Sequence, residues 1–182
     1  TPDMYVRTAK VIIDESEQDA TLRSLGAVTS GAVRMRSNAS VANEMEAFAS
    51  PDLMQMVVSR LSLETSYKEK QLFRDVDIYG HNPVEMRLVA HNPQSSFSFI
   101  VSKLSEDKLL LKGFKVGKDE VDGTVECAPG DTVSTPVGMI ALYSTLYFDD
   151  FRNPVMVSWR NSMAVAKSYC QDLNVNLSNK ES

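Results

Sequence analysis

The sequence predicts an α+β fold in which a mixed or antiparallel sheet is packed with amphipathic helices. Two segments, near residues 51–61 and 162–173, have apolar residues at the spacing of a helix, and several strand-like runs lie between them. Helices and strands do not alternate regularly, which favours α+β over a doubly wound sheet. The chain has 182 residues, 43% of them hydrophobic and 24% charged, and is predicted to form a single domain over residues 1–182.

The N-terminal part contains one predicted strand and one irregular segment. Residues 5–13 are rich in β-branched and aromatic side chains, which is typical of a strand. Residues 14–39 mix acids, small residues and two glycines without a steady period. We therefore expect residues 14–39 to be a mobile insert, with a short helix near residues 20–25.

The first long helix has a clear start signal. A helical region opens at Ser40 and is interrupted at residues 50–52, where Ser50 is a good N-cap and Pro51 suits the first helical position. Apolar residues then fall on one side of the helix. They are Leu53, Met54, Val57, Val58 and Leu61. We expect this face, Leu53, Val57 and Leu61 in particular, to be buried against the sheet.

After a polar patch at residues 67–70, the chain is predicted to form β-structure. The predicted strands are 72–79, 84–90, 97–104, 108–114, 120–127, 132–142 and 155–159. Residues 105–107 are predicted to be a tight turn. A second helix over residues 162–173 repeats the apolar spacing with Val165, Ala166, Tyr169, Cys170 and Leu173.

The only two histidines, His81 and His91, each precede Asn-Pro and bracket the alternating segment 84–90. Asn-Pro favours a turn, because proline disfavours the helical conformation of the residue before it. A strand between the histidines would place them roughly 25–30 Å apart, at about 3.3 Å per residue. Two ligands of one zinc ion each lie within about 2.1 Å of it, so these histidines are predicted to be turn residues and not a shared metal site.

Other reactive residues give weak signals. Cys127 and Cys170 have no metal or redox spacing, which leaves a buried free thiol or a disulfide between them as alternatives. The pairs Asp149–Asp150 and Asp75–Asp77 are ordinary for an acidic surface, with a cation site as the less favoured interpretation. Trp159 and the aromatic residues at 143–148 could stack on a sugar, although packing within the core is the simpler interpretation.

The sequence contains no signature of catalysis or cofactor binding. It lacks a phosphate-binding glycine-rich loop and a GxSxG motif, so neither a catalytic residue nor a cofactor is predicted. A net charge of −5 and a pI near 5.1 argue against a nucleic-acid partner. These residues predict a binding or assembly module.

One run, "NEMEAFASPDLMQMVVSRLSLETSY", closely resembles a signature of the polysaccharide co-polymerases, the chain-length-determinant (Wzz-type) family. That family includes the extracytoplasmic part of bacterial capsular tyrosine kinases. The matching positions are Asn43, Glu44, Glu46, Ser50, Leu53, Val57, Val58, Leu61, Leu63 and Tyr67.

Four further segments match the family pattern in the same order. "TPDMYVRTAKVII" resembles the strand after the first membrane helix, and "IYGHNPVEMRL" resembles the family's tyrosine, proline and strand. "GDTVSTPVGMIAL", with Thr135, Pro136 and Gly138, is similar to the TP-x-G hairpin, and "AVAKSYCQDLNV" to the helix after it. The sequence departs from the pattern at Met45 and Ala47 and in the 14–39 insert.

The resemblance implies a membrane-proximal base domain without the coiled-coil part, taken from a longer membrane protein. Its implied location is the periplasmic face of the bacterial inner membrane. Its implied function is non-catalytic regulation of the chain length, polymerisation or export of a capsule, exopolysaccharide or O-antigen. The implied partners are other copies in a ring-like homo-oligomer, the polymerase or export machinery, and the growing polysaccharide. No cofactor or metal is implied for this fragment, although a parent protein could carry a cytoplasmic tyrosine kinase domain.

Two other functions stay open at this point. One is a carbohydrate- or peptide-binding module of a secreted or surface protein, with the aromatic residues at 143–148 or Trp159 as its platform. The other is an enzyme, which would need a pocket that gathers Asp149, Asp150 or a histidine.

Overall fold

The computed structural model describes residues 6–11, 42–90 and 95–176. The chain divides into two compact units, one of Thr1–Ser50 with Asn174–Ser182 and one of Pro51–Leu173. Each unit is described by itself, and the single domain expected over residues 1–182 stays a prediction.

The described part of the first unit contains one helix, at residues 42–48. Residues 6–11 form neither helix nor strand, so the strand predicted over residues 5–13 is wrong for this part. A strand needs a hydrogen-bonded neighbour, and the described part of this unit contains no strand that could pair with it. The remaining ends of that prediction and the insert at 14–39 lie outside the described residues.

The second unit begins and ends with a pair of helices, α3 (Pro51–Arg60) and α4 (Ser162–Asp172). Helix α3 starts directly after Ser50, as predicted. The two helices pack on each other through the buried residues Val58, Val165 and Ala166, with Met54 and Leu63 beside them. At the start of α4, the side chain of Asn161 caps the helix by accepting a hydrogen bond from the N–H of Met163 at 3.0 Å.

The prediction that Leu53, Val57 and Leu61 are buried against the sheet is wrong. They are 39%, 41% and 53% exposed, whereas Val58 is 0% exposed. A single partner helix covers only part of a broad apolar stripe, and α3 turns its Val58 side toward α4. The strands, in turn, bury their apolar faces in a separate core.

Helix α3 ends in a Schellman motif that turns the chain into the first strand. The N–H of Leu63 donates to the carbonyl of Val58 at 2.9 Å, and Leu63 also packs on that side chain. Ser62 occupies the left-handed position of the motif with φ of 53°, where glycine is the usual residue. The carbonyl of Glu64 then accepts a hydrogen bond from the N–H of Arg160 at 2.9 Å, which joins this turn to the segment before α4.

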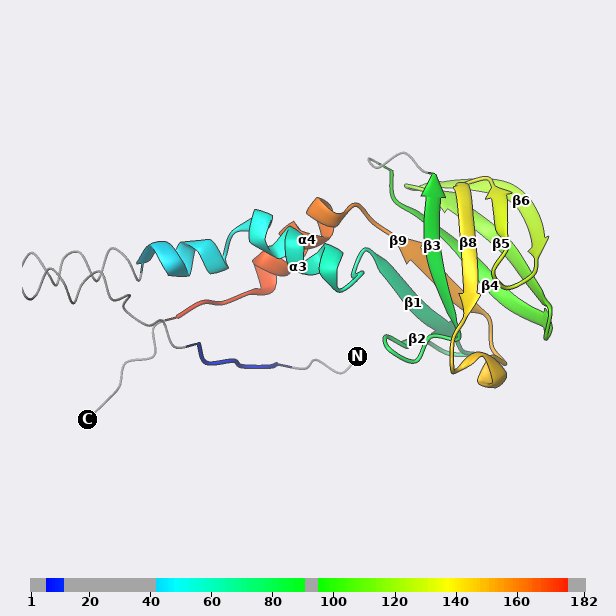
Figure 1. Cartoon of the computed structure of the whole chain (residues 1–182), viewed down its shortest axis with the longest axis horizontal. Coiled ribbons are helices and arrows are strands. Elements are labelled where there is room, and N and C mark those ends of the chain that lie inside the picture. The colour runs from blue at the N-terminus through cyan, green and yellow to red at the C-terminus, as the bar shows by residue number, and fades with distance from the viewer. Residues whose placement is uncertain (1–5, 12–41, 91–94, 177–182) are drawn as a thin grey trace, which may run out of the picture. The chain divides into compact units, whose positions relative to one another are not determined.

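Between the two helices the chain forms two antiparallel sheets, which confirms the α+β class (Figure 1). The larger sheet has the order β2-β1-β9-β4-β5-β6, and the smaller sheet has the order β3-β8-β7. The strands of the larger sheet are β1 (Thr65–Lys70), β2 (Asp75–Asp77), β4 (Phe97–Ser105), β5 (Lys108–Val116), β6 (Asp119–Cys127) and β9 (Val155–Trp159). Those of the smaller sheet are β3 (Val84–Ala90), β7 (Thr132–Thr135) and β8 (Gly138–Ser144).

Most predicted strands are confirmed, with three differences. The strand predicted at 72–79 is wrong except for Asp75–Asp77, which form β2, because residues 72–73 are the bend between β1 and β2. Strand β1 was predicted as a polar patch, because in "TSYKEK" only Tyr67 is buried and its neighbours are polar. The segment predicted as one strand at 132–142 is split by a turn at Pro136–Val137 into β7 and β8. The turn predicted at residues 105–107 is confirmed, since Ser105 pairs with Lys108.

The main core lies between the two sheets. It is built from alternate residues of the strands, including Val84 and Met86 of β3, Phe99 and Val101 of β4, Leu109, Leu111 and Phe114 of β5, Ile140 and Leu142 of β8, and Val155 and Val157 of β9. In Figure 1 the smaller sheet lies in front of the larger one. None of the helices in the described residues is long and apolar enough to cross a membrane.

Candidate functional site

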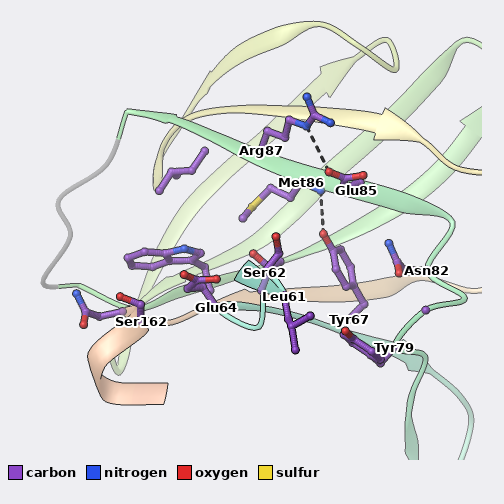
Figure 2. Close-up of a pocket in the computed structure, with 15 residues that line it drawn as sticks. Leu61, Ser62, Glu64, Tyr67, Tyr79, Asn82, Glu85, Met86, Arg87 and Ser162 are labelled. Atoms are coloured by element: carbon purple, nitrogen blue, oxygen red, sulfur yellow. Dashed lines mark hydrogen bonds and ion pairs between the residues drawn. The ribbon is translucent and has the colours of Figure 1, made fainter. Parts of the chain in front are cut away.

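An open groove of about 820 Å³ lies where the two sheets meet the helix pair (Figure 2). One wall comes from β3 of the smaller sheet and the other from β1 of the larger sheet. The turn between α3 and β1, the loop before β3 and the junction between β9 and α4 complete its lining. The groove therefore collects residues from four separated segments of the chain.

Tyr67 and Met86 join the two walls of the groove. The hydroxyl of Tyr67 on β1 accepts a hydrogen bond of 2.9 Å from the backbone N–H of Met86 on β3. Burial raises the pKa of Tyr67 from 10.0 to about 12, the hydrogen bond from Met86 opposes this, and the nearby Glu85 carboxylate adds to it. Tyr67 is therefore a neutral, fixed crosslink between the sheets.

Aromatic side chains line the groove at two places. Trp159, at the end of β9, stacks on Phe97 with a centroid distance of 5.5 Å, so this ring belongs partly to the core. Tyr79, in the loop before β3, is 62% exposed and also lines the groove. Figure 2 shows Tyr79 beside Tyr67 at one end of the groove.

Charged and polar side chains line the groove from both walls. Arg87 contacts Glu85 at 3.3 Å, and its guanidinium lies 4.8 Å from the centre of the Tyr143 ring. Glu64, at the foot of β1, accepts a hydrogen bond from the hydroxyl of Ser59 at 3.0 Å. Asn82 is fixed by a 2.9 Å hydrogen bond from its side-chain nitrogen to the carbonyl of Val84.

These groups suit the binding of a polar, uncharged or mixed ligand. Carboxylate, guanidinium, amide and hydroxyl groups supply donors and acceptors, and the tyrosine and tryptophan rings supply apolar faces. The described residues that line the groove include no histidine, cysteine or lysine. The geometry thus offers hydrogen bonds from these groups and stacking on the aromatic rings.

A smaller pocket of about 230 Å³ gathers two of the residues named as enzyme candidates. His81 and Asp150 both line it, together with Tyr147 and Arg152, whereas Asp149 does not. The ring of His81 lies 5.0 Å from that of Tyr147. Among the described residues that line this pocket there is no serine, threonine or cysteine that could act as a nucleophile.

His81 takes a position expected of a turn residue. His81 follows the turn at residues 79–80, and its backbone N–H donates to the carbonyl of Ile78 at 2.9 Å. Strand β3 occupies Val84–Ala90, as predicted, and His91 lies outside the described residues. Within the described residues, no group of three or more histidine, cysteine, aspartate or glutamate side chains could hold a metal ion.

The remaining candidates are separate from the groove. Both cysteines are free, and burial, followed by the charge of Asp131, raises the pKa of the Cys127 thiol. Cys170 is only half-buried on α4. Asp75 forms an ion pair of 4.0 Å with Lys70, and Asp77 accepts a hydrogen bond from the N–H of Tyr79 at 3.0 Å.

The residues that the resemblance singled out lie in both units. Asn43, Glu44 and Glu46 are exposed on the helix at 42–48, and Ser50 directly precedes α3. Thr135, Pro136 and Gly138 lie at the turn of the hairpin between β7 and β8. There the hydroxyl of Thr135 donates to the carbonyl of Gly138 at 2.7 Å and accepts from the N–H of Val137 at 3.3 Å.

This hairpin packs closely over β6. A Cβ atom at Gly123 would lie 2.7 Å from Cγ of Pro136, which is closer than two non-bonded carbon atoms normally approach. The absence of a side chain at Gly123 therefore allows the proline ring to lie on the strand, while Val137 beside it is buried in the core.

The sequence did not predict the groove or the residues Tyr79, Asn82, Glu85 and Arg87 that line it. A scan of protein-family models found no model that matches this chain, and a search of curated proteins found no similar protein.

Proposed function

We propose that this chain is a non-catalytic domain at the periplasmic face of a bacterial inner membrane. In this proposal it belongs to a ring-like homo-oligomer that regulates the chain length, polymerisation or export of a surface polysaccharide. Its partners would be other copies of itself, the polymerase or export machinery, and the growing polysaccharide.

The main support comes from where the motif residues lie. The tyrosine that ends the first motif, Tyr67, joins the two sheets through Met86. The Thr-Pro-x-Gly motif forms the turn of a hairpin that contributes Val137 to the core. These side chains link the two sheets and form the hairpin turn, roles that few other residue types could fill and that involve no catalysis.

The connectivity supports the same proposal. The chain enters the β-structure from α3 and leaves it through α4, and these helices pack side by side. The β-structure is thus inserted in the chain between two helices that pack on each other. Such a domain suits a platform built into a longer helical protein.

The experiment removes the domain from its host. In the bacterium that encodes this chain, Pro51–Leu173 is replaced by a short flexible linker, and surface polysaccharide is analysed by gel electrophoresis. We expect the modal length to be lost or the amount to fall. An unchanged length distribution and amount, with the shortened protein present at its normal level, would contradict the proposal.

The groove favours a second candidate function, a carbohydrate-binding module. Trp159 and Tyr79 line it together with Glu64, Glu85 and Arg87, a combination suited to a sugar. The test is titration with oligosaccharides, in which Tyr79→Ala and Arg87→Ala should abolish binding. His81→Ala is the matched control, because His81 does not line the groove and its ring instead lies next to Tyr147. Tyr143 and Tyr147 are not part of the lining either.

Peptide binding by strand addition is the less favoured form of that module. Among the described strands β3 pairs only with β8, so its other edge faces the groove. The Met86 N–H on that edge already donates to Tyr67, which removes a central donor that an added strand would need.

A further inference from the structure

The hairpin between β1 and β2 ends in two exposed apolar side chains. Leu72 is 93% exposed and Phe73 is 96% exposed. The turn is tight, because Lys70 pairs with Asp75 and the N–H of Gln71 donates to the carbonyl of Arg74 at 3.1 Å. Leu72 and Phe73 are therefore the whole tip of this hairpin.

The other tight hairpins show how unusual this tip is. The strands β1 and β2 are joined by four residues, 71–74, whereas the described strands also form three turns of two residues, at Glu106–Asp107, Gly117–Lys118 and Pro136–Val137. The first two are polar, and Val137 of the third is buried in the core. Among these described turns, only the β1–β2 tip exposes two large apolar residues.

The local backbone does not explain leucine and phenylalanine at this tip. Among the described non-glycine residues only Ser62 has a positive φ, so the backbone at Leu72 and Phe73 demands no special residue type and polar residues would fit there equally well. Exposure of a leucine and a phenylalanine to water is also unfavourable. Both side chains thus point to an apolar environment that covers the tip.

The tip lies at the end of β1 that is away from the helix pair. Strand β1 begins next to the end of α3 and runs to Lys70, whose N–H donates to the carbonyl of Pro154 at 2.8 Å. Strand β9 starts there and runs back to Trp159, next to α4. The tip therefore projects from the opposite end of β1 to the helix pair.

The size and charge of the tip decide between a protein and a membrane as its partner. Specific protein interfaces bury on the order of 1,000 Å² or more, which two protruding side chains do not supply by themselves. Leucine and phenylalanine partition into the boundary between headgroups and acyl chains, and the stems of Lys70 and Arg74 can extend beside them. Opposite charges alternate next to the tip, as in the pair Lys70–Asp75, so attraction to anionic lipid contributes little.

We propose that the Leu72–Phe73 tip inserts into the interfacial layer of a lipid bilayer. The exposure of Leu72 and Phe73 supports this insertion independently of the function proposed above. Insertion would be shallow and weak, since only two side chains take part.

The test places a tryptophan at the tip. In Phe73→Trp, fluorescence is measured with phosphatidylcholine vesicles whose acyl chains are brominated near the headgroups or near the bilayer centre. The unchanged chain gives the background from Trp159. Lys118→Trp is the matched control, because Lys118 lies on the polar two-residue turn between β5 and β6.

We expect vesicles to shift the Phe73→Trp emission to shorter wavelength, with stronger quenching by the shallow bromines and little effect of salt. Lys118→Trp should not respond. Equal responses at the two positions, no response at position 73, or a response abolished by salt would each overturn the proposal. A shift that grows with protein concentration without lipid would overturn it too, and would assign the tip to a contact between copies.

A double variant separates insertion from folding. Leu72→Ser with Phe73→Ser should lower the vesicle-bound fraction in flotation about tenfold, because most of the inserted apolar surface is removed. Its thermal midpoint should equal that of the unchanged chain, since neither side chain belongs to the core. Unchanged flotation with an unchanged midpoint would overturn the proposal, because another surface would then bind the vesicles.

Discussion

The hydroxyl of Tyr67 accepts the backbone N–H of Met86 at 2.9 Å and thereby fastens β1 of the larger sheet to β3 of the smaller one. The bond is buried, and it satisfies a donor at the edge of the smaller sheet. A tyrosine at this position therefore combines core packing with a polar link between the sheets.

Tyr67→Phe should destabilise the protein by about 1–3 kcal/mol, because it leaves the buried Met86 N–H without its acceptor. Chemical denaturation followed by circular dichroism measures the change. Tyr79→Phe is the matched control, since Tyr79 is mostly exposed and its hydroxyl is not part of this link. Equal stabilities of Tyr67→Phe and the unchanged chain would mean that water or another group replaces the hydroxyl.

The same tyrosine predicts a pH dependence. Its pKa is about 12 in the folded chain against 10.0 for an ordinary tyrosine, so the folded state favours the protonated hydroxyl. The protonated Tyr67 hydroxyl therefore contributes fully to the free energy of unfolding below pH 10. This contribution is lost as the pH rises from 10 to 12, by about 2–3 kcal/mol in total.

Comparison with Tyr67→Phe isolates this effect, because the other titrating groups are common to both proteins. The stability difference between the unchanged chain and Tyr67→Phe should be constant from pH 7 to about pH 9 and should shrink above pH 10. A difference that stays constant up to pH 12 would contradict the raised pKa.

The sequence predicted strands in which one face is buried and the other is more exposed. The prediction failed for strands that lack this contrast. In β4, Phe97, Phe99 and Val101 alternate with less buried residues, and the period is visible in the letters. In β1 the only buried residue is Tyr67, so a period could not be recognised. Its strand character comes from pairing with β9, whose residues lie some ninety positions later in the chain.

The groove and the buried side of α3 could not be predicted for a related reason. The groove combines the segments near Glu64, Glu85 and Trp159, which only the folded chain brings together. The helical period identified the apolar stripe of α3 correctly. It could not show which side of the stripe meets α4, because the partners Val165 and Ala166 are more than one hundred residues away.

Val58 and Val57 provide a direct test of that packing. Val58→Asp should cost about 3 kcal/mol or more, because it places a carboxylate between α3 and α4. Val57→Asp should cost less than about 1 kcal/mol, because Val57 is largely exposed. Thermal unfolding followed by the helical signal distinguishes them, and equal losses would mean that α3 is rotated relative to its described position.

Gly123 and Pro136 test the close contact of the Thr-Pro-x-Gly hairpin with β6. Gly123→Ala adds a Cβ atom only 2.7 Å from Cγ of the proline and should cost about 1–3 kcal/mol through overpacking. In a Pro136→Ala background the ring is absent, so the same change should cost less than about 1 kcal/mol.

The double-mutant cycle is the measurement, with the free energy of unfolding of the four proteins determined by chemical denaturation. A coupling of about 1 kcal/mol or more would locate the cost in the contact between glycine and proline. Additive losses would instead place it in the backbone of β6, next to the register shift between Lys112 and Phe114 of β5. Phe114 lies 3.6 Å from the same Cβ position and is retained in all four proteins, so it cannot produce the coupling.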